Sequence, residues 1–198
     1  AAGSGGIWNA GLSLGSAGQT VKVNSAGNAL EFGSGGGLLQ TVFFQTSTRF
    51  TSSSDSYVAT PMTITITPTS ASSKIVLLLR TLINTTGDTY PRFKYQRAIS
   101  GGATSFINTE PAGANGGNSL GVYLTDRANS TNNHQMNVMS DVYQDSPNTT
   151  SAITYTLYGV RENGGTYYIN TSANNEGGGT SDYDQVGTST LLAMETGV

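Results

Sequence analysis

The sequence has no cysteine and a single histidine, His134. A disulfide framework and a thiol nucleophile are therefore excluded, and so is a zinc site built from Cys and His ligands. Charged residues make up 11% of the chain, against about 25% in an average globular protein. The nine Lys and Arg residues are spread along a chain of net charge −3, so the basic footprint of a nucleic-acid-binding protein is missing. We expect no nucleic-acid partner and no cofactor.

Long hydrophobic runs are also missing. The longest, residues 75–79, is far shorter than the roughly 20 apolar residues that span a bilayer, so we expect no membrane insertion. The chain begins Ala-Ala-Gly-Ser-Gly-Gly, without an initiator Met or the charged and apolar regions of a signal peptide. We interpret it as an excerpt from a longer protein.

Small uncharged residues take the place of charge. The chain contains 26 Gly, 23 Ser, 28 Thr and 16 Asn, which together are close to half of its 198 residues. Ser, Thr and Asn hydrogen-bond locally and glycine loses the most backbone entropy in a helix, so this composition favours strands and turns. No stretch has a helical repeat of useful length. The sequence predicts an all-β protein.

The first segment, residues 1–37, is rich in glycine and has few apolar residues. Short apolar pairs such as Leu12/Leu14 and Val21/Val23 recur with the spacing of two that is typical of strands. These pairs are too few to bury a core within one chain, so the segment is either a linker or a structure completed by other chains. We favour a stalk or trimerisation segment whose strands are completed by other copies.

Residues 38–198 change character, because apolar runs bounded by turn signals recur at the spacing of a sandwich or barrel. We predict a tip domain that is an antiparallel β-sandwich, jelly-roll-like, although strand spacing alone leaves an immunoglobulin-like sandwich open. The expected strands are residues 38–45, 62–66, 75–79, 93–96, 106–107, 120–125, 135–143, 152–160, 166–170 and 188–194.

Several of these strands carry a more specific prediction. The run at 75–79 is continuously apolar, which is typical of a strand covered on both faces. Pro61 and Pro68 flank the strand at 62–66 and indicate either an edge position or the ends of the strand. Asn163-Gly164-Gly165 predicts a hairpin, because these residues tolerate the positive φ of tight turns. Tyr167 and Tyr168 point to opposite sides of a strand, so we expect at most one of them in the core.

Three segments point to a family. Residues 12–32 read LSLGSAGQTVKVNSAGNALEF and resemble the GQ…VNSAG…ALEF segment that often precedes the tip domain of tailed-bacteriophage fibre proteins. Residues 64–76, ITITPTSASSKIV, resemble the paired early strands of such tips, and residues 189–195, STLLAME, resemble their final strand. The sequence departs from the pattern at its end, where three further residues follow Met-Glu. Residues 90–148 match no segment of the family.

The resemblance implies a homotrimeric virion appendage, a tail fibre, whose C-terminal domain adheres to a host-cell surface receptor. Its partners would be other tail or fibre proteins of the virion and a glycan or protein receptor on the host. A second hypothesis is a purely structural trimerisation or capping domain of a tail or capsid fibre. A third is a depolymerase of surface polysaccharide.

Sugars are held by aromatic faces and by amide or carboxylate groups, and loops rich in Tyr, Ser, Gly and Asn provide both. Two regions have this composition: the loop at 171–187 and the segment before the strand at 93–96. Arg92, Lys94 and Arg97 would also meet an anionic polysaccharide, or they form a solvated strand face beside a core of Phe93 and Tyr95. The candidate receptor-binding residues are Tyr90, Arg92, Asn174, Asn175, Asp182, Tyr183 and Asp184.

Catalytic and metal-binding patterns have ordinary explanations. Ser13 and Ser119 lie in Gly-x-Ser-x-Gly motifs. The nucleophile elbow of a hydrolase leads from a strand into a helix, and the sequence predicts no helix after either serine. The near pairs Asp141/Asp145 and Asp182/Asp184 would cleave a glycan only if they faced each other across it. A calcium loop starting at residue 182 would have Val186 where a third oxygen ligand is needed. We expect no catalytic residues and no metal.

Overall fold

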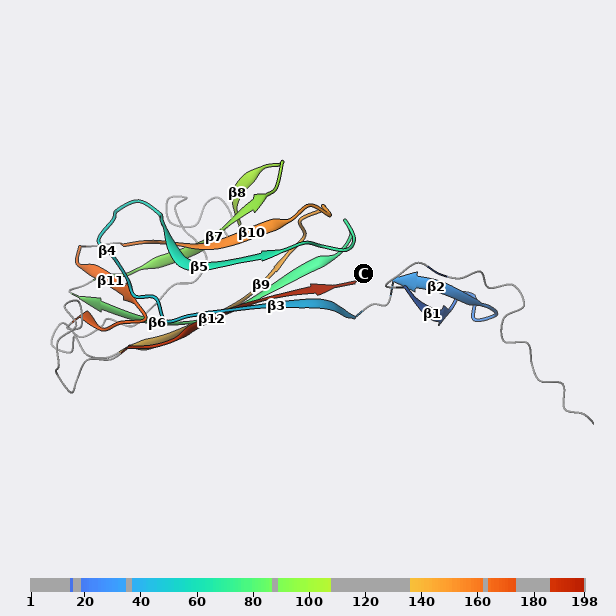
Figure 1. The fold of residues 1–198 in the computed structure, drawn as a ribbon, viewed down its shortest axis with the longest axis horizontal. Helices are drawn as coiled ribbons and strands as arrows, with labels where there is room; N and C mark the ends of the chain where they lie inside the picture. The colour runs from blue at the N-terminus through green and yellow to red at the C-terminus, as the bar shows by residue number, and fades with distance from the viewer. Residues whose placement is uncertain are drawn as a thin grey trace, which may run out of the picture.

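The computed structural model describes residues 15, 19–34, 37–86, 89–107, 136–161, 164–173 and 186–197. The elements in these ranges are β-strands paired antiparallel, which confirms the all-β prediction. Figure 1 shows a small hairpin beyond one end of a larger body. The expected strand at 120–125 and the motif serines at 13 and 119 lie outside the described residues.

The hairpin consists of β1 (Gln19–Val23) and β2 (Leu30–Ser34), which pair with each other within the chain. Gly27 adopts a φ of 72° in the turn between them, a conformation that glycine reaches without steric cost. All five residues of β1 are exposed. A two-stranded sheet is marginally stable at best in water, so completion of this segment by other copies remains our prediction.

Two sheets pack face to face in the body. One contains β5 (Val58–Ile66), β10 (Ile153–Val160), β7 (Arg92–Ile99) and β8 (Thr104–Ile107) in that order. The other is built on β6 (Lys74–Thr86), which is long enough to pair with two strands end to end along one edge. These are β12 (Ser189–Thr196), followed outward by β3 (Leu38–Thr46), and β11 (Thr166–Ile169), followed by β4 (Phe50–Ser52); β9 (Asn137–Asp145) pairs along the opposite edge of β6.

The strand pairing identifies the fold as a jelly roll. Eight strands make up the body apart from the short β4 and β11, and in chain order they pair first with last, second with seventh, third with sixth and fourth with fifth: β3 with β12, β5 with β10, β6 with β9 and β7 with β8. A long antiparallel ribbon rolled up on itself gives this pairing, which is the two-Greek-key arrangement of a jelly roll. The predicted sandwich is therefore confirmed, and the immunoglobulin-like alternative is excluded.

The core lies between the sheets and follows the alternation of the strands. Phe93 and Tyr95 of β7 are fully buried while their neighbours face outward, as predicted. Along β6, Ile75, Leu77 and Leu79 are buried, but the residues between them are only half-buried. The prediction that this strand is covered on both faces is therefore wrong for the described part of a single chain.

The prediction that the strand at residues 62–66 lies at the edge of a sheet is confirmed. β5 lies at the end of its sheet. Its register with β10 is interrupted between Thr63 and Ala59, so that Pro61 sits in a bulge. A proline in a bulge on an edge strand breaks no ladder hydrogen bond, because its missing N–H is not needed there.

The hairpin predicted at Asn163-Gly164-Gly165 is wrong. Both glycines have positive φ, 77° and 72°, but the strands on either side belong to different sheets: β10 pairs with β5 and β7, and β11 with β4 and β6. Glycine allows a sharp change of direction in either arrangement. A local signal of this kind does not distinguish a hairpin from a corner between sheets.

The paired tyrosines lie on opposite faces of β11, as predicted, and only Tyr167 belongs to the core cluster between the sheets, but both side chains are buried. The ring of Tyr167 packs edge-on against Phe93, with centroids 5.5 Å apart. Tyr168, on the other face of β11, lies opposite Asn84 of β6. The chain after β11 folds back over this side, where the backbone N–H of Ala173 donates to the side-chain oxygen of Asn84 at 3.1 Å.

Candidate functional site

A lysine side chain lies between two aromatic rings on the outer face of the four-stranded sheet. The alternation of β7 buries Phe93 and Tyr95 and turns Lys94 outward. The Nζ atom of Lys94 lies 3.6 Å from the ring centroid of Tyr57 and 3.8 Å from that of Phe106. An ammonium over an aromatic face is attracted by the negative face of the ring. Burial lowers the pKa of Lys94 below its ordinary value.

A third ring, that of Tyr158, completes the group, which we call the caged-lysine cluster (Tyr57, Lys94, Phe106 and Tyr158). Tyr158 lies directly opposite Lys94 in the pairing of β10 with β7. Its ring meets Phe106 edge-on, with centroids 5.3 Å apart. Phe106, from β8, is 39% exposed. The cluster therefore offers solvent an aromatic surface and a positive charge held at a fixed position.

The cluster stands out from the rest of its sheet face. Towards the other end of β5 and β10, the outward residues are threonines joined in pairs across the strands. Thr63 bonds Thr156 at 3.0 Å, and Thr65 bonds Thr154 at 2.9 Å. The threonines satisfy one another, whereas the caged-lysine cluster combines the two group types, an aromatic face and a cation, that hold acidic sugars.

Only two of the predicted receptor-binding residues lie in the described part of the chain. Arg92 begins β7 and faces the same side as Lys94, two residues before it, and Tyr90 comes just before the strand; both are half-buried. Tyr90 and Arg92 thus precede Lys94 of the caged-lysine cluster by four and two residues in the chain. Asn174, Asn175, Asp182, Tyr183 and Asp184 lie outside the described residues, as does His134.

The interpretation of Arg97 as a surface cation is wrong. Arg97 is on the inward side of β7, with Phe93 and Tyr95, and its Nη1 donates to the two oxygens of Asp145 at 2.8 and 3.1 Å. The alternation that turns Phe93 and Tyr95 inward also turns Arg97 inward, two residues further along β7. A charge was expected to face water, but Asp145 provides a buried partner for it.

The carboxylate pair Asp141/Asp145 lies on one strand, β9. Four residues of extended chain separate the two groups by roughly 13 Å, whereas the paired carboxylates of glycosidases are about 5–9.5 Å apart. Asp145 is also held by Arg97 and Tyr155. This pair is not arranged for glycan cleavage. The second pair, Asp182/Asp184, lies outside the described residues.

Most of the caged-lysine cluster has no local signal in the sequence. Tyr57, Phe106 and Tyr158 come from three separate segments, and the pairing of strands alone brings them together. Only the outward direction of Tyr158 follows from a local pattern. Tyr155 and Leu157 face inward on the same strand, so the alternation turns Tyr158 outward. Within the described ranges, no three His, Asp or Glu side chains gather as metal ligands, and no helix could cross a membrane.

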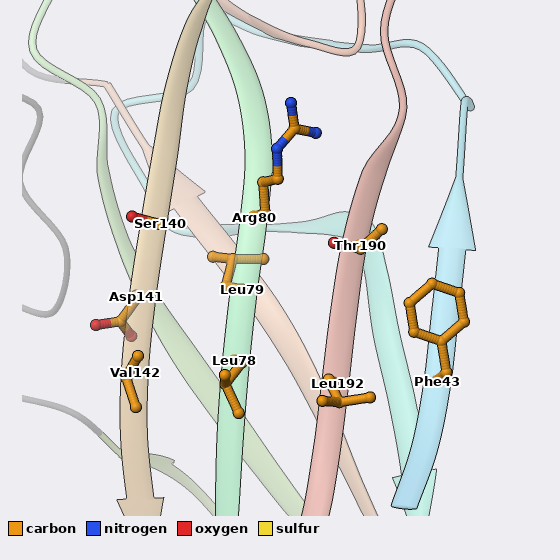
Figure 2. Close-up of a pocket in the computed structure, with 9 residues that line it drawn as sticks. All are labelled: Phe43, Leu78, Leu79, Arg80, Ser140, Asp141, Val142, Thr190 and Leu192. Carbon is orange, nitrogen blue, oxygen red and sulfur yellow. The ribbon is translucent and has the colours of Figure 1, made fainter.

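The six-stranded sheet has a hollow of about 350 Å³ on its outer face. Figure 2 shows its lining: side chains from the neighbouring strands β9, β6, β12 and β3 stand in rows across the sheet. Apolar side chains dominate one row, and Arg80 stands in the row beside it. This surface differs from the caged-lysine cluster because it offers little to a polar ligand.

Comparisons with known proteins give no family. No protein-family model matches the chain, and no curated protein matches its sequence. Among solved structures, the chain is similar to one of infectious bursal disease virus, Gx strain, with 11% identity, a TM-score of 0.37 and coverage of 86% of this chain and 41% of the other. It is also similar to the VP2 subviral particle of the same virus, with 9% identity, a TM-score of 0.31 and coverage of 91% and 43%. The chain thus spans less than half the length of either structure, and the fold assignment rests on the strand pairing itself.

Proposed function

We propose that the chain is a virion structural protein, the tip of a tail fibre, that adheres to a glycan on the host-cell surface. The caged-lysine cluster carries this proposal. Its ammonium is held at 3.6 and 3.8 Å from two ring centroids, so little side-chain entropy remains to be lost when a ligand binds. A sugar ring packs on the exposed aromatic surface, and its carboxylate accepts hydrogen bonds from Lys94. The preferred receptor is an acidic polysaccharide.

Two further features support the proposal. The three segments that resemble tailed-phage fibre proteins include β1, β2, the turn between β5 and β6, and β12. Lys94 of the cluster is near the start of β7, which follows the last residues of β6 in the chain. The hairpin joins the body at the opposite end (Figure 1). A hairpin shared by three copies would present three such clusters together. Weak single sites would then gain from avidity, by about 10² to 10⁴-fold.

Replacing Lys94 by methionine tests the adhesive site. Methionine keeps the unbranched stem between the rings and removes the charge, so binding to an immobilised polysaccharide rich in uronic acids is expected to weaken by about tenfold or more. Binding can be measured by surface plasmon resonance, with a neutral polysaccharide in parallel. Lys74→Met is the matched control, because Lys74 belongs to the other sheet and contacts Ser146 instead. Equal losses in the two variants would show that net charge alone attracts the glycan.

A purely structural role is the second candidate, and the apolar outer face of the six-stranded sheet favours it. A trimerisation or capping domain needs such a face but no receptor site. Failure of the full chain to bind host cells and every glycan tested, combined with a trimeric mass, would favour this role over adhesion. Release of sugar fragments from capsule polysaccharide would instead establish a depolymerase.

A further inference from the structure

The outer face of the six-stranded sheet is unusually apolar for a surface in contact with water. One transverse row consists of Phe43, Leu192, Leu78 and Val142, which the strand register places directly beside one another on β3, β12, β6 and β9. We call these four side chains the apolar row; Figure 2 shows them side by side. Phe43 is 60% exposed and Val142 is 70% exposed.

The neighbouring rows add further apolar side chains. On one side Met194 and Val76 stand next to each other. On the other side comes a polar row of Thr190, Arg80 and Ser140, and Leu82 and Val138 follow in the row beyond it. Arg80 is the single charged residue between them, and it donates to the backbone oxygen of Thr188 at 3.2 Å. Depletion of charge around a cluster of large apolar residues is characteristic of the core of a protein interface.

The sequence of β6 gives an independent reason to expect a cover. Residues 75–79 form a continuous apolar run, the pattern of a strand buried on both faces. Within the chain only the inner residues Ile75, Leu77 and Leu79 are buried, while Val76 and Leu78 on the outer side are half-buried. A second layer over this face would account for the pattern.

The hairpin indicates that this layer is another copy of the same chain. β1 and β2 expose Val21, Val23 and Leu30 and form a sheet too small to be stable alone. The strand that follows the hairpin is β3, which carries Phe43. Beside it, the end of β12 is joined to the start of β3 by a hydrogen bond from Gly197 N to Gly37 O of 3.0 Å. Copies held together at the hairpin would therefore bring β3 and β12 of each body together.

The size of the face fits the same conclusion. Four strands about 4.8 Å apart, over the four outward positions from Val76 to Leu82, cover on the order of 300–400 Å². A stable interface buries about 800 Å² per partner, so the face supplies roughly half and needs a second contact region. The hairpin of the same chain, with its exposed apolar side chains, offers such a region.

We propose that the outer face centred on the apolar row packs against the same face of other copies around a common axis. This inference rests on the homotrimer that forms part of the proposed function, and it adds which face of the body is buried. The four-stranded sheet then faces outward, with the caged-lysine cluster accessible on each copy.

Because the sequence has no cysteine, a single introduced cysteine is the only thiol in the protein, and its labelling rate reports how accessible that one position is. The test uses the full chain, reduced, with either Val142→Cys or Thr65→Cys, followed by labelling with a maleimide. Both are exposed strand positions in the single chain, and valine and threonine have the same shape, so the pair is matched. In the assembled protein, the thiol at 142 is expected to react at least tenfold more slowly than the thiol at 65.

The mass of each protein in solution, measured by sedimentation equilibrium, separates the possible outcomes. A trimer with slow labelling at 142 supports the interface. A trimer in which both thiols react at the same rate overturns the interface and leaves the homotrimer standing, whereas a single-chain mass overturns both. Val142→Asp provides a second measurement: it is expected to lower the mass or shift assembly to at least tenfold higher concentration, and Thr65→Asp is not.

Discussion

Asp145→Ala is expected to lower the free energy of unfolding by about 3–5 kcal/mol, because it leaves a charge without its partner inside the sandwich. Asp145 is 5% exposed. Its carboxylate accepts hydrogen bonds from Arg97 of β7, from the Tyr155 hydroxyl of β10 at 2.7 Å, and from the backbone N–H of Ser146 at 2.8 Å. One side chain of the six-stranded sheet thus joins two strands of the other sheet.

The Tyr155 hydroxyl adds to this loss. Burial, together with the negative charge of Asp145, raises the pKa of Tyr155 well above its ordinary value. The hydroxyl therefore stays protonated at neutral and acidic pH and needs an acceptor there. Removal of the carboxylate leaves this buried donor unsatisfied, which is unfavourable in addition to the loss of the ion pair.

Asp55→Ala is the matched control for Asp145→Ala. Asp55 also accepts from an arginine, with its Oδ1 2.7 Å from Nε of Arg161, but its side chain is 76% exposed. Exposed ion pairs contribute little to stability, so urea unfolding of this variant should follow the wild type closely. Equal losses in the two aspartate variants would contradict the proposed effect of burial. The double replacement Arg97→Met with Asp145→Leu should recover part of the lost stability, since it removes both charges but still leaves the Tyr155 hydroxyl without its acceptor.

The second large effect is expected at the other end of the body. Glu195, near the end of β12, is fully buried. Its Oε1 accepts from both the backbone N–H and the hydroxyl of Thr69 at 2.7 Å, and its Oε2 accepts from the amide of Gln40 at 2.6 Å. The carboxylate thus connects β12 to β3 and to the turn between β5 and β6. Glu195→Gln places an amide group where only acceptors fit, and we expect a loss of about 2–3 kcal/mol.

The loss from Glu195→Gln should depend on pH. Burial works to raise the pKa of Glu195, but the hydrogen bonds to the carboxylate outweigh it and hold the pKa below the ordinary value of 4.5. A group whose pKa is lowered by folding stabilises the protein above its unfolded pKa, and this contribution disappears as the pH falls through the folded pKa. The wild-type advantage over the glutamine variant should therefore be full at pH 7 and shrink below about pH 4.5.

Urea midpoints for both proteins at a series of pH values between 7 and 3 would measure this difference. The comparison isolates Glu195, because all other titrating groups are shared. One of them, Asp141, has a pKa raised by burial and acts in the opposite direction in both proteins. Midpoints that stay the same distance apart across the whole range would contradict the role of Glu195. Both proteins should be compared at one chain concentration, since assembly also adds stability.

Much of the fold could be predicted from the sequence, because the core follows strand alternation. The period of two along β7 places Phe93 and Tyr95 inside and turns Lys94 outward. Pro61 indicated that its strand lies at the edge of a sheet. The corner between the two sheets could not be predicted, because Gly164 and Gly165 allow the same backbone conformations in a corner as in a hairpin. The burial of Tyr168 also could not, since it depends on a segment that folds back over the sheet.

The candidate site was less predictable, for a physical reason. Arg92 and Tyr90 were found through local composition, but the rings around Lys94 come from residues up to about one hundred positions apart and meet only through the register of β7, β8 and β10. Likewise, the buried partner of Arg97 lies 48 positions away in the chain. Contacts of this kind are fixed by the pairing of strands, which a single sequence does not reveal.

The position of β12 has a consequence for synthesis of the protein. This strand, formed by residues 189–196, lies between β3 and β6, and so fills the gap between two strands made much earlier. Until it leaves the ribosome, both neighbours have an unpaired edge that is available to other nascent chains. Formation of the native body is therefore expected to wait until β12 has been made, and growing chains to depend on chaperones until this strand is in place.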